Sequence, residues 1–191
     1  SYEIKPHRGD GFLYIYNTKT DKLDSIYRAT RAKFSGNSNY IVFKINPGFD
    51  TLRTCELEEI DKKKWPKDTL GIYVFDQDTL LKYPNFKSYD VNEESDWIVI
   101  NYNHNNSLQK KKKGFCKRRK NKNKIHESDG KQLHVFNPVT FNKTSTLSSE
   151  YFYNDVMDYS FSKNGSYISF TSHQKIENDS VQLSILNLNS G

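Results

Sequence analysis

The sequence predicts an all-β protein built from repeated antiparallel sheets. Residues 34–43 return near the end of the chain as residues 161–170, with six of the ten positions identical, and a worn copy lies between them at residues 91–100. Each copy has a polar turn carrying Asn and then a run of β-branched and aromatic residues, which is typical of a β-hairpin. A hairpin alone cannot bury its apolar faces, so the repetition indicates sheets that stack on one another.

A third strand is expected after each hairpin, because four segments share one pattern. They read aliphatic, variable, aliphatic, aromatic or Leu, and then Asn or Asp, at residues 13–17, 72–76, 133–137 and 183–187. The closing Asn or Asp suits a turn, since its side chain bonds the local backbone and tolerates unusual φ. Weaker fourth strands are expected at residues 23–28, 79–83 and 144–147.

The spacing of these strands predicts part of a β-propeller, with about three to four four-stranded antiparallel blades. The third strands recur 59, 61 and 50 residues apart, against roughly 40–50 residues for propeller blades, and two insertions account for the excess. Central strands such as residues 40–43 are apolar at successive positions, as in sheets covered on both faces. The sequence holds 13 Tyr, 12 Phe and one Met, and it shows no long amphipathic pattern. No helix is therefore expected.

The expected blades divide the whole chain. They are the end of one blade at 12–28, a blade at 31–83 with an insertion at 47–67, a blade at 87–148 with a Lys-rich insertion at 105–129, and an incomplete blade at 156–191. On this strand count we expect an open piece, cut at both ends. No segment of the sequence resembles a signal peptide or a membrane span.

Several segments of the chain resemble known families. The hairpin at residues 158–171 resembles the repeat of WD40-like and TolB-like propellers. Other segments, together with the Lys-rich insertion, carry a more specific resemblance. They are similar to the amino-terminal propeller of large peptidases from Bacteroidetes-type bacteria. Those peptidases belong to the prolyl oligopeptidase (S9) family of serine peptidases. These segments are residues 13–20, 32–35, 42–45, 49–53 and 66–73.

The resemblance implies a propeller that cleaves no bond itself. In that family it caps an α/β-hydrolase domain that carries the Ser, Asp and His triad, and it restricts entry to oligopeptides. The nucleophile there lies in a Gly-x-Ser-x-Gly elbow, and no such motif occurs in this sequence. No catalytic residue, cofactor or metal ligand is therefore assigned to the chain. The resemblance also implies a parent protein in the periplasm or the cell envelope of a bacterium.

The net charge of +6 comes from one segment rather than from the fold. Between Lys110 and Lys124 lie ten of the 29 Lys and Arg residues and no acidic residue, so the remainder holds 19 basic against 23 acidic residues. We expect a solvated insertion, since like charges repel and little apolar material is present. The alternative is a contact with a polyanion, made by Lys110, Lys111, Lys112, Lys113, Lys117, Arg118, Arg119 and Lys120. Only Phe115 interleaves this run, which argues against nucleic acid as the partner.

Paired carboxylates and two cysteines are candidate binding groups. Glu93 and Glu94 are candidates for holding the amino end of a peptide, because some members of the resembled family use a Glu pair in this way; an exposed turn is the alternative. The same alternatives apply to Glu58 and Glu59. Cys55 lies in the first insertion, and in the second Cys116 with His104 and His126 forms no zinc spacing of an established kind.

Two classes of function follow from the sequence. One is the gate and size filter of a serine peptidase, acting with a hydrolase domain and an oligopeptide substrate. The other is a propeller scaffold for protein–protein interaction with no associated enzyme. Both predict the same strands.

Overall fold

The computed structural model describes residues 1–18, 20–102, 130–140, 150–174 and 180–189 of the 191-residue chain. It is built almost entirely from antiparallel strands that form three sheets, and within each sheet every strand is hydrogen-bonded to the next strand in sequence. The first sheet comprises β1 (Tyr2–Ile4), β2 (Phe12–Asn17) and β3 (Lys22–Tyr27). The second comprises β4 (Ala29–Phe34), β5 (Tyr40–Ile45), β6 (Thr69–Val74) and β7 (Thr79–Pro84).

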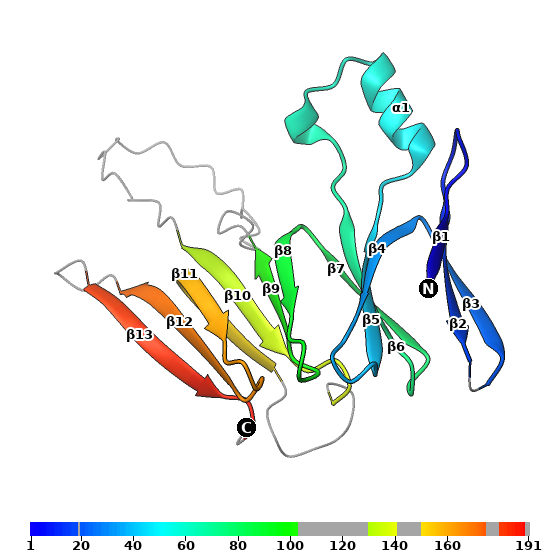
Figure 1. The fold of residues 1–191 in the computed structure, drawn as a ribbon. Coiled ribbons are helices and arrows are strands. Elements are labelled where there is room, and N and C mark those ends of the chain that lie inside the picture. Colours follow the sequence, from blue (N-terminus) through cyan, green and yellow to red (C-terminus); the bar gives the residue numbers. More distant parts are fainter. Residues whose placement is uncertain (19, 103–129, 141–149, 175–179, 190–191) are drawn as a thin grey trace, which may run out of the picture.

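The third sheet has six strands in sequence order. They are β8 (Phe86–Val91), β9 (Ile98–Tyr102), β10 (Lys131–Phe136), β11 (Glu150–Phe161), β12 (Tyr167–Gln174) and β13 (Ser180–Asn187). Figure 1 shows the sheets standing side by side in a row, with β1–β3 at one end and β13 at the other. The expected third strands coincide with β2, β6, β10 and β13, while the expected strand at 144–147 lies outside the described residues.

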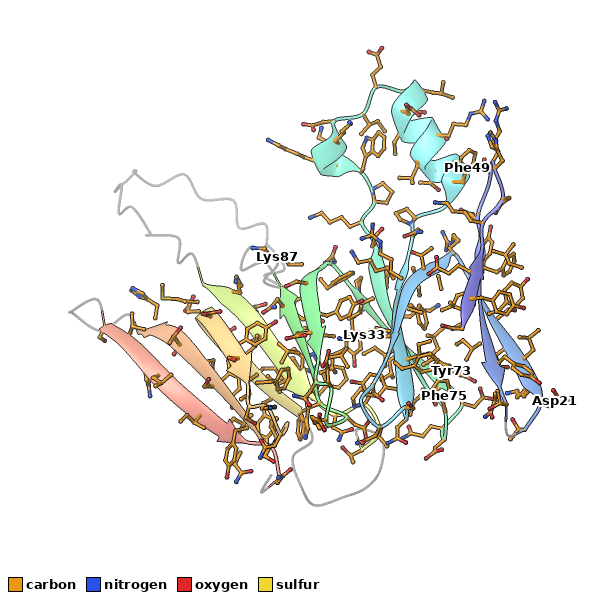
Figure 2. The ribbon with its side chains drawn as sticks, viewed as in Figure 1. Asp21, Lys33, Phe49, Tyr73, Phe75 and Lys87 are labelled. Carbon is orange, nitrogen blue, oxygen red and sulfur yellow. The ribbon has the colours of Figure 1, made fainter. Side chains whose placement is uncertain are left out.

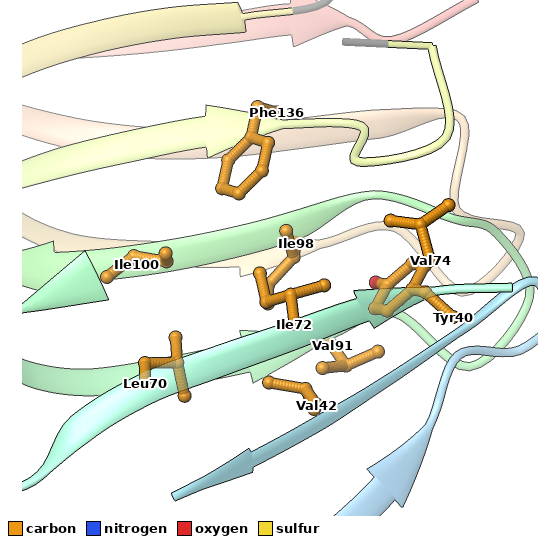
Figure 3. Close-up of a cluster of buried hydrophobic side chains, with 9 residues drawn as sticks. All are labelled: Tyr40, Val42, Leu70, Ile72, Val74, Val91, Ile98, Ile100 and Phe136. Atoms are coloured by element: carbon orange, nitrogen blue, oxygen red, sulfur yellow. The ribbon is translucent and has the colours of Figure 1, made fainter. Parts of the chain in front are cut away.

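Packing between the sheets explains the apolar runs of the central strands. On β5, Tyr40 and Val42 face the third sheet, where they join Val91 and Ile98 in a buried cluster (Figure 3). Ile41 and Phe43 point the other way and pack with Leu13 and Ile15 of the first sheet. Since successive side chains on a strand point to opposite faces, a strand covered on both sides must be apolar at every position.

The six-stranded sheet contains two stacked halves. Val99 and Val135, from β9 and β10, share a buried cluster with Val156, Ile168 and Phe170, from β11 and β12. The twelve residues of β11 pair with β10 through the first part of the strand and with β12 through the last part. One long strand therefore ends one four-stranded unit and begins the next. The prediction of an all-β, antiparallel, propeller-type fold is confirmed by this stacking of meander sheets.

A single residue in the left-handed region joins each unit to the next. Arg28 lies between β3 and β4 with φ 60°, Asn85 between β7 and β8 with φ 61°, and Asp155 within β11 with φ 55°. The strand after each of these residues is then bulged, because its register with the following strand shifts within the next few residues. At all three places one residue with a left-handed φ is followed by a bulge. Asp155 therefore occupies a junction equivalent to those at Arg28 and Asn85.

The expectation of no helix is wrong for the first insertion. Residues 49–57 form α1 (Phe49–Leu57), and a 3-10 turn follows at Lys62–Lys64. Cys55 is the one buried residue of α1, so the helix needs no long apolar stripe and shows none in the sequence. Within the described residues, no helix has the length and apolar character needed to cross a membrane.

Candidate functional surface

One end of the sheet row is closed by three equivalent hairpin turns. In each turn the backbone N–H of the first residue donates to the carbonyl of the residue five positions later, and the side chain of the first residue accepts a backbone N–H within the turn. The backbone bonds are Ser35 to Tyr40 at 3.0 Å, Asn92 to Trp97 at 3.1 Å and Ser162 to Tyr167 at 2.9 Å. Gly165 has φ 66°, as the Asn-Gly sequence there requires.

The turns of neighbouring units are bonded to each other. The side-chain amides of Asn37 and Asn39 both donate to Oδ2 of Asp96, at 3.2 and 2.7 Å. A Cβ on Gly36 would lie 2.2 Å from the carbonyl oxygen of Glu93, so only glycine allows this approach. The polar groups of this end are therefore used to hold one sheet against the next.

The structure places Glu93 and Glu94 on the turn between β8 and β9. Both are exposed, and the Glu93 carboxylate lies 3.7 Å from Nζ of Lys33. The Glu94 backbone N–H donates to Oδ1 of Asn92 at 2.8 Å. No desolvated cavity encloses the pair among the described residues, so a peptide contact there remains a prediction. Glu58 and Glu59 follow α1 and are also exposed.

The opposite end carries the first insertion, and Asp10 anchors it. Oδ1 of Asp10 accepts the backbone N–H of Phe49 at 2.8 Å, which caps the first turn of α1 from another sheet (Figure 2 labels Phe49). Oδ2 accepts the hydroxyl of Tyr27 at 2.7 Å. The insertion is closed by the indole N–H of Trp65, which donates to the carbonyl of Ile60 at 2.8 Å. Asp10 thus ties α1 to Tyr27 of the first sheet.

Hollows lie between the first and second sheets at both ends. A cavity of about 240 Å³ opens beneath α1 and is bordered by Asp10 and Arg28. Another of about 530 Å³ lies near the turns and is bordered by Phe34, Tyr73 and Phe75; Figure 2 labels Tyr73 and Phe75. Both hollows are lined by residues of the first and second sheets.

A His–Glu pair lies where the third sheet faces the second, with His134 buried and Glu150 partly exposed. Nε2 of His134 is 2.7 Å from Oε1 of Glu150, but the orientation of the two groups is not that of a hydrogen bond. The imidazole is stacked between Phe136 and Phe152, with ring centroids 4.4 and 4.2 Å away. Burial lowers the pKa of His134 to about 4, because the carboxylate does not offset the lost hydration. Burial also raises the pKa of Glu150. These groups pack the sheets and face no open cleft described above.

The other candidates of the sequence lie outside the described residues. They are the Lys-rich run from Lys110 to Lys120, Cys116, His104 and His126. Within residues 1–18, 20–102, 130–140, 150–174 and 180–189, no three His, Cys, Asp or Glu side chains gather in a way that could hold a metal ion. Cys55 is buried on α1 as a free thiol.

Three polar side chains at the contacts between elements were not predicted from the sequence: Asp10, Arg28 and His134. His134 gave a local signal, since it interrupts the apolar run of its strand. Asp10 gave none, because its partner Phe49 lies 39 residues away. Arg28 gave none either, because the cavity that it borders is lined by residues from separate sheets. Only the folded arrangement of the two sheets brings these groups together.

No protein-family model and no curated protein matches the chain. Among solved structures, the chain is similar to the β-propeller domain of the Trilobed protease from Pyrococcus furiosus, described as having an open velcro topology. The identity is 13% and the TM-score 0.43, over 93% of this chain and 46% of that one. It is also similar to the acylaminoacyl peptidase of Pyrococcus horikoshii, at 10% identity and a TM-score of 0.40, over 93% of this chain and 26% of that one.

An acylaminoacyl peptidase in complex with Z-Gly-Gly-Phe-chloromethyl ketone overlaps at 12% identity and a TM-score of 0.37, over 98% of this chain and 30% of that one. The chain thus spans less than half the length of each of these three structures. The evidence for the propeller-type fold is the strand order of the chain, the packing of its central sheets on both faces and the repeated junctions between its units.

Proposed function

We propose that the chain is the non-catalytic propeller region of a serine peptidase of the prolyl oligopeptidase family. In this proposal it gates and filters the access of oligopeptides to an α/β-hydrolase domain of the same parent protein. The observation that carries the proposal is the stack of meander sheets, in which the charged and polar groups described above hold turns and sheets together. A rigid frame of this kind suits restriction of access, which needs shape and not chemistry.

The peptidase part of the proposal rests on the sequence resemblance. The segments that carry it fall on β2, on the β4–β5 hairpin, on α1 and on the segment leading into β6. They therefore cover the two ends of the second sheet as well as its buried strands. The hydrolase domain and the oligopeptide substrate belong to the proposal.

The full-length protein encoded by the natural reading frame is the material for the test. A fluorophosphonate probe should label one serine outside these 191 residues, and acylated peptides should be cleaved only below a length limit. Replacing Asp96 with Ala removes both amide contacts between the second and third sheets. This variant should raise cleavage of peptides above the limit several-fold and leave that of short peptides unchanged. Failure to label any serine, or equal cleavage at all lengths, contradicts the proposal.

A scaffold for protein–protein interaction is the second candidate, and β13 favours it. Val181, Leu183 and Ile185 alternate along this strand and are 58%, 65% and 69% exposed. Such a strip suits contact with a further sheet, whether of the same parent protein or of a partner. A full-length protein that binds a protein partner through this strip, and carries no serine reactive to fluorophosphonate, would favour the scaffold over the peptidase.

We further propose that the parent protein works in the periplasm or the cell envelope of a bacterium. For the Lys-rich run we propose a solvated insertion, with contact to a polyanion as the alternative. Both proposals follow from the sequence alone. Salt titrations of binding to DNA and to anionic vesicles separate the insertion from its alternative: contact with a polyanion gives binding that weakens steeply between low and moderate ionic strength. Binding that is absent at low salt, or unchanged by salt, rules out the polyanion contact.

A further inference from the structure

The third strand of each unit carries the same five-residue pattern, so equivalent positions can be compared from one unit to the next. These strands are β2, β6, β10 and β13. The first and third positions of the pattern point toward the following unit, and this side of a unit is termed its back face. In the first three units no side chain at these positions is more than 5% exposed, because the following unit covers them. They are Leu13 and Ile15, Ile72 and Val74, and Leu133 and Val135.

The back face of the last unit carries the same aliphatic positions but is open. This unit comprises the last part of β11 with β12 and β13. Leu183 and Ile185 stand at the first and third positions of the pattern and are 65% and 69% exposed, and Val181 beside them is 58% exposed. No following unit covers them in the part of the chain that the structure describes. The last unit is therefore built like the covered units and lacks its cover.

The second and fourth positions of the pattern point toward the preceding unit, and this side is termed the front face. In the second sheet they are Tyr73 and Phe75, which pack on the cluster formed by the back face of the first sheet. In the next unit they are His134 and Phe136, whose ring centroids lie 5.7 and 5.3 Å from that of Tyr83 in the second sheet. Phe136 also shares a buried cluster with the back face of that sheet. In both contacts a front face bearing rings meets an aliphatic back face.

The front face of the first sheet is also open. Tyr14 and Tyr16 stand at its second and fourth positions, and the register places Tyr2 opposite Tyr14 and Leu23 opposite Tyr16. The rings of Tyr2 and Tyr14 are stacked with their centroids 5.1 Å apart. Figure 1 places this sheet at the opposite end of the row from β13. The side chains of this face that are 38–53% exposed are Tyr2, Ile4, Phe12, Tyr16, Leu23 and Tyr27.

We propose that the open back face of one chain binds the open front face of a second copy. Leu183 and Ile185 of one copy then pack against Tyr14 and Tyr16 of the other, as the same pattern positions do between the first and second sheets. A second copy is the occupant because each described contact between units joins a back face to a front face. Two identical back faces have no such counterpart. The contact is heterologous, so each copy uses two different surfaces.

This inference does not rest on the proposed peptidase function, and a parent protein without a reactive serine leaves it untouched. Two double variants of the 191-residue chain test it. Tyr16→Thr with Leu23→Thr removes apolar area from the front face at two cross-strand neighbours. Leu183→Thr with Ile185→Thr does the same on the back face. Thr keeps the strand propensity at all four positions.

The two variants should complement each other in sedimentation velocity runs at equal protein concentration. The wild-type chain should associate, whereas each double variant alone should sediment as a monomer, because every contact needs one face of each kind. An equimolar mixture should form a species of two chains, about twice 22.4 kDa. In that species the intact back face of the front-face variant meets the intact front face of the other variant.

Leu57→Thr is the control for loss of apolar area away from both faces, since Leu57 is 74% exposed on α1. This variant should associate like the wild type. Equal urea midpoints show that the variants keep the fold, and Tyr2→Thr on the edge strand β1 replaces the front-face pair if its midpoint falls. A monomeric wild-type chain, or a mixture that stays monomeric, overturns the proposal. A front-face variant that associates like the wild type also overturns it, and indicates that two β13 strips pair with each other.

The full-length protein encoded by the natural reading frame tests the choice of occupant. A cross-linker attached to Ile185→Cys should join two copies and reach the first sheet of the second copy. A cross-link to another sheet of the same chain shows that the parent protein covers β13 itself, and overturns the assignment of a second copy.

Discussion

At the level of single residues, the junctions show how a local choice sets the path of the chain. Arg28, Asn85 and Asp155 each turn the chain from one four-stranded unit into the next with φ between 55° and 61°. The left-handed region costs an ordinary L-residue about 1–2 kcal/mol, and less for Asn or Asp, whose side chains bond locally. The three junctions are therefore equivalent in geometry but unequal in free energy.

Exchanging the junction residues tests this difference. Arg28→Asn should raise the free energy of unfolding by about 0.5–1 kcal/mol, and Asn85→Arg should lower it by a similar amount. Urea denaturation followed by circular dichroism measures both changes. A loss of stability in Arg28→Asn comparable to that in Asn85→Arg would show that side-chain packing, and not φ, decides the cost at these positions.

His134 should make stability depend on pH. Burial lowers its pKa to about 4 in the folded protein, against roughly 6.5 when unfolded. The unfolded chain thus binds more protons between these values, so this stabilisation is full above about pH 6.5 and is lost as the pH falls toward 4. The raised pKa of Glu150 acts in the opposite sense above its unfolded value. We expect a net loss of roughly 2 kcal/mol over the His134 window.

His134→Gln should flatten that pH profile, whereas replacing the exposed His7 with Gln should leave it unchanged. Denaturant midpoints measured at half-unit steps from pH 7 to pH 4 give the comparison. A profile that keeps its slope in His134→Gln assigns the acid sensitivity to other groups.

At the level of elements, α1 depends on a residue far away in the sequence. Gly48 at the N-cap position has no side chain that could cap the helix. The Asp10 carboxylate caps it instead, by accepting the backbone N–H of Phe49. Asp10→Ala should lower the free energy of unfolding by about 1–2 kcal/mol and speed amide exchange in α1, because one capping bond and the Tyr27 bond are lost. Asp50→Ala, in the same first turn but exposed, should cost only about 0.3–1 kcal/mol. Equal effects of the two changes would point to charge near the helix end rather than to capping.

How far the sequence predicts each element depends on where its side chains lie. The strands β5, β6 and β9 were predicted because burial on both faces leaves uninterrupted apolar runs, and the hairpins because Asn-rich turns repeat. The helix α1 was not predicted because it buries only Cys55, so its sequence shows no periodic apolar pattern. The union of two units through β11 was also missed, since Asp155 makes the junction without the Gly or Pro that usually marks a break. The cavity at Arg28 depends on contacts between sheets, which no local pattern records.

At the level of the whole molecule, the last strand presents apolar side chains to solvent. Val181, Leu183 and Ile185 form one face of β13, and β13 has a single neighbour, β12, in its sheet. An exposed apolar strip on an edge strand favours association of chains. We expect the 191-residue chain to self-associate at micromolar to millimolar concentration.

Replacing Val181, Leu183 and Ile185 together with Thr should shift sedimentation velocity profiles toward the monomer, since Thr keeps strand propensity and removes apolar area. Leu57, which is 74% exposed on α1, is the matched control, and Leu57→Thr should change nothing. A wild-type chain that sediments as a monodisperse monomer contradicts the expectation.

The one-residue junctions also determine where this architecture can grow. Lengthening the connection between the second and third strands of a unit adds only a small cost of loop closure, because that cost rises with the logarithm of length. The chain shows this at residues 46–68, where a helix has been accommodated without disturbing the pairing of β5 with β6. One extra residue at Arg28, Asn85 or Asp155 would instead turn every buried side chain of the following strand to its opposite face. New sequence can therefore be gained through the strand connections of a unit, while the junctions between units must keep their length.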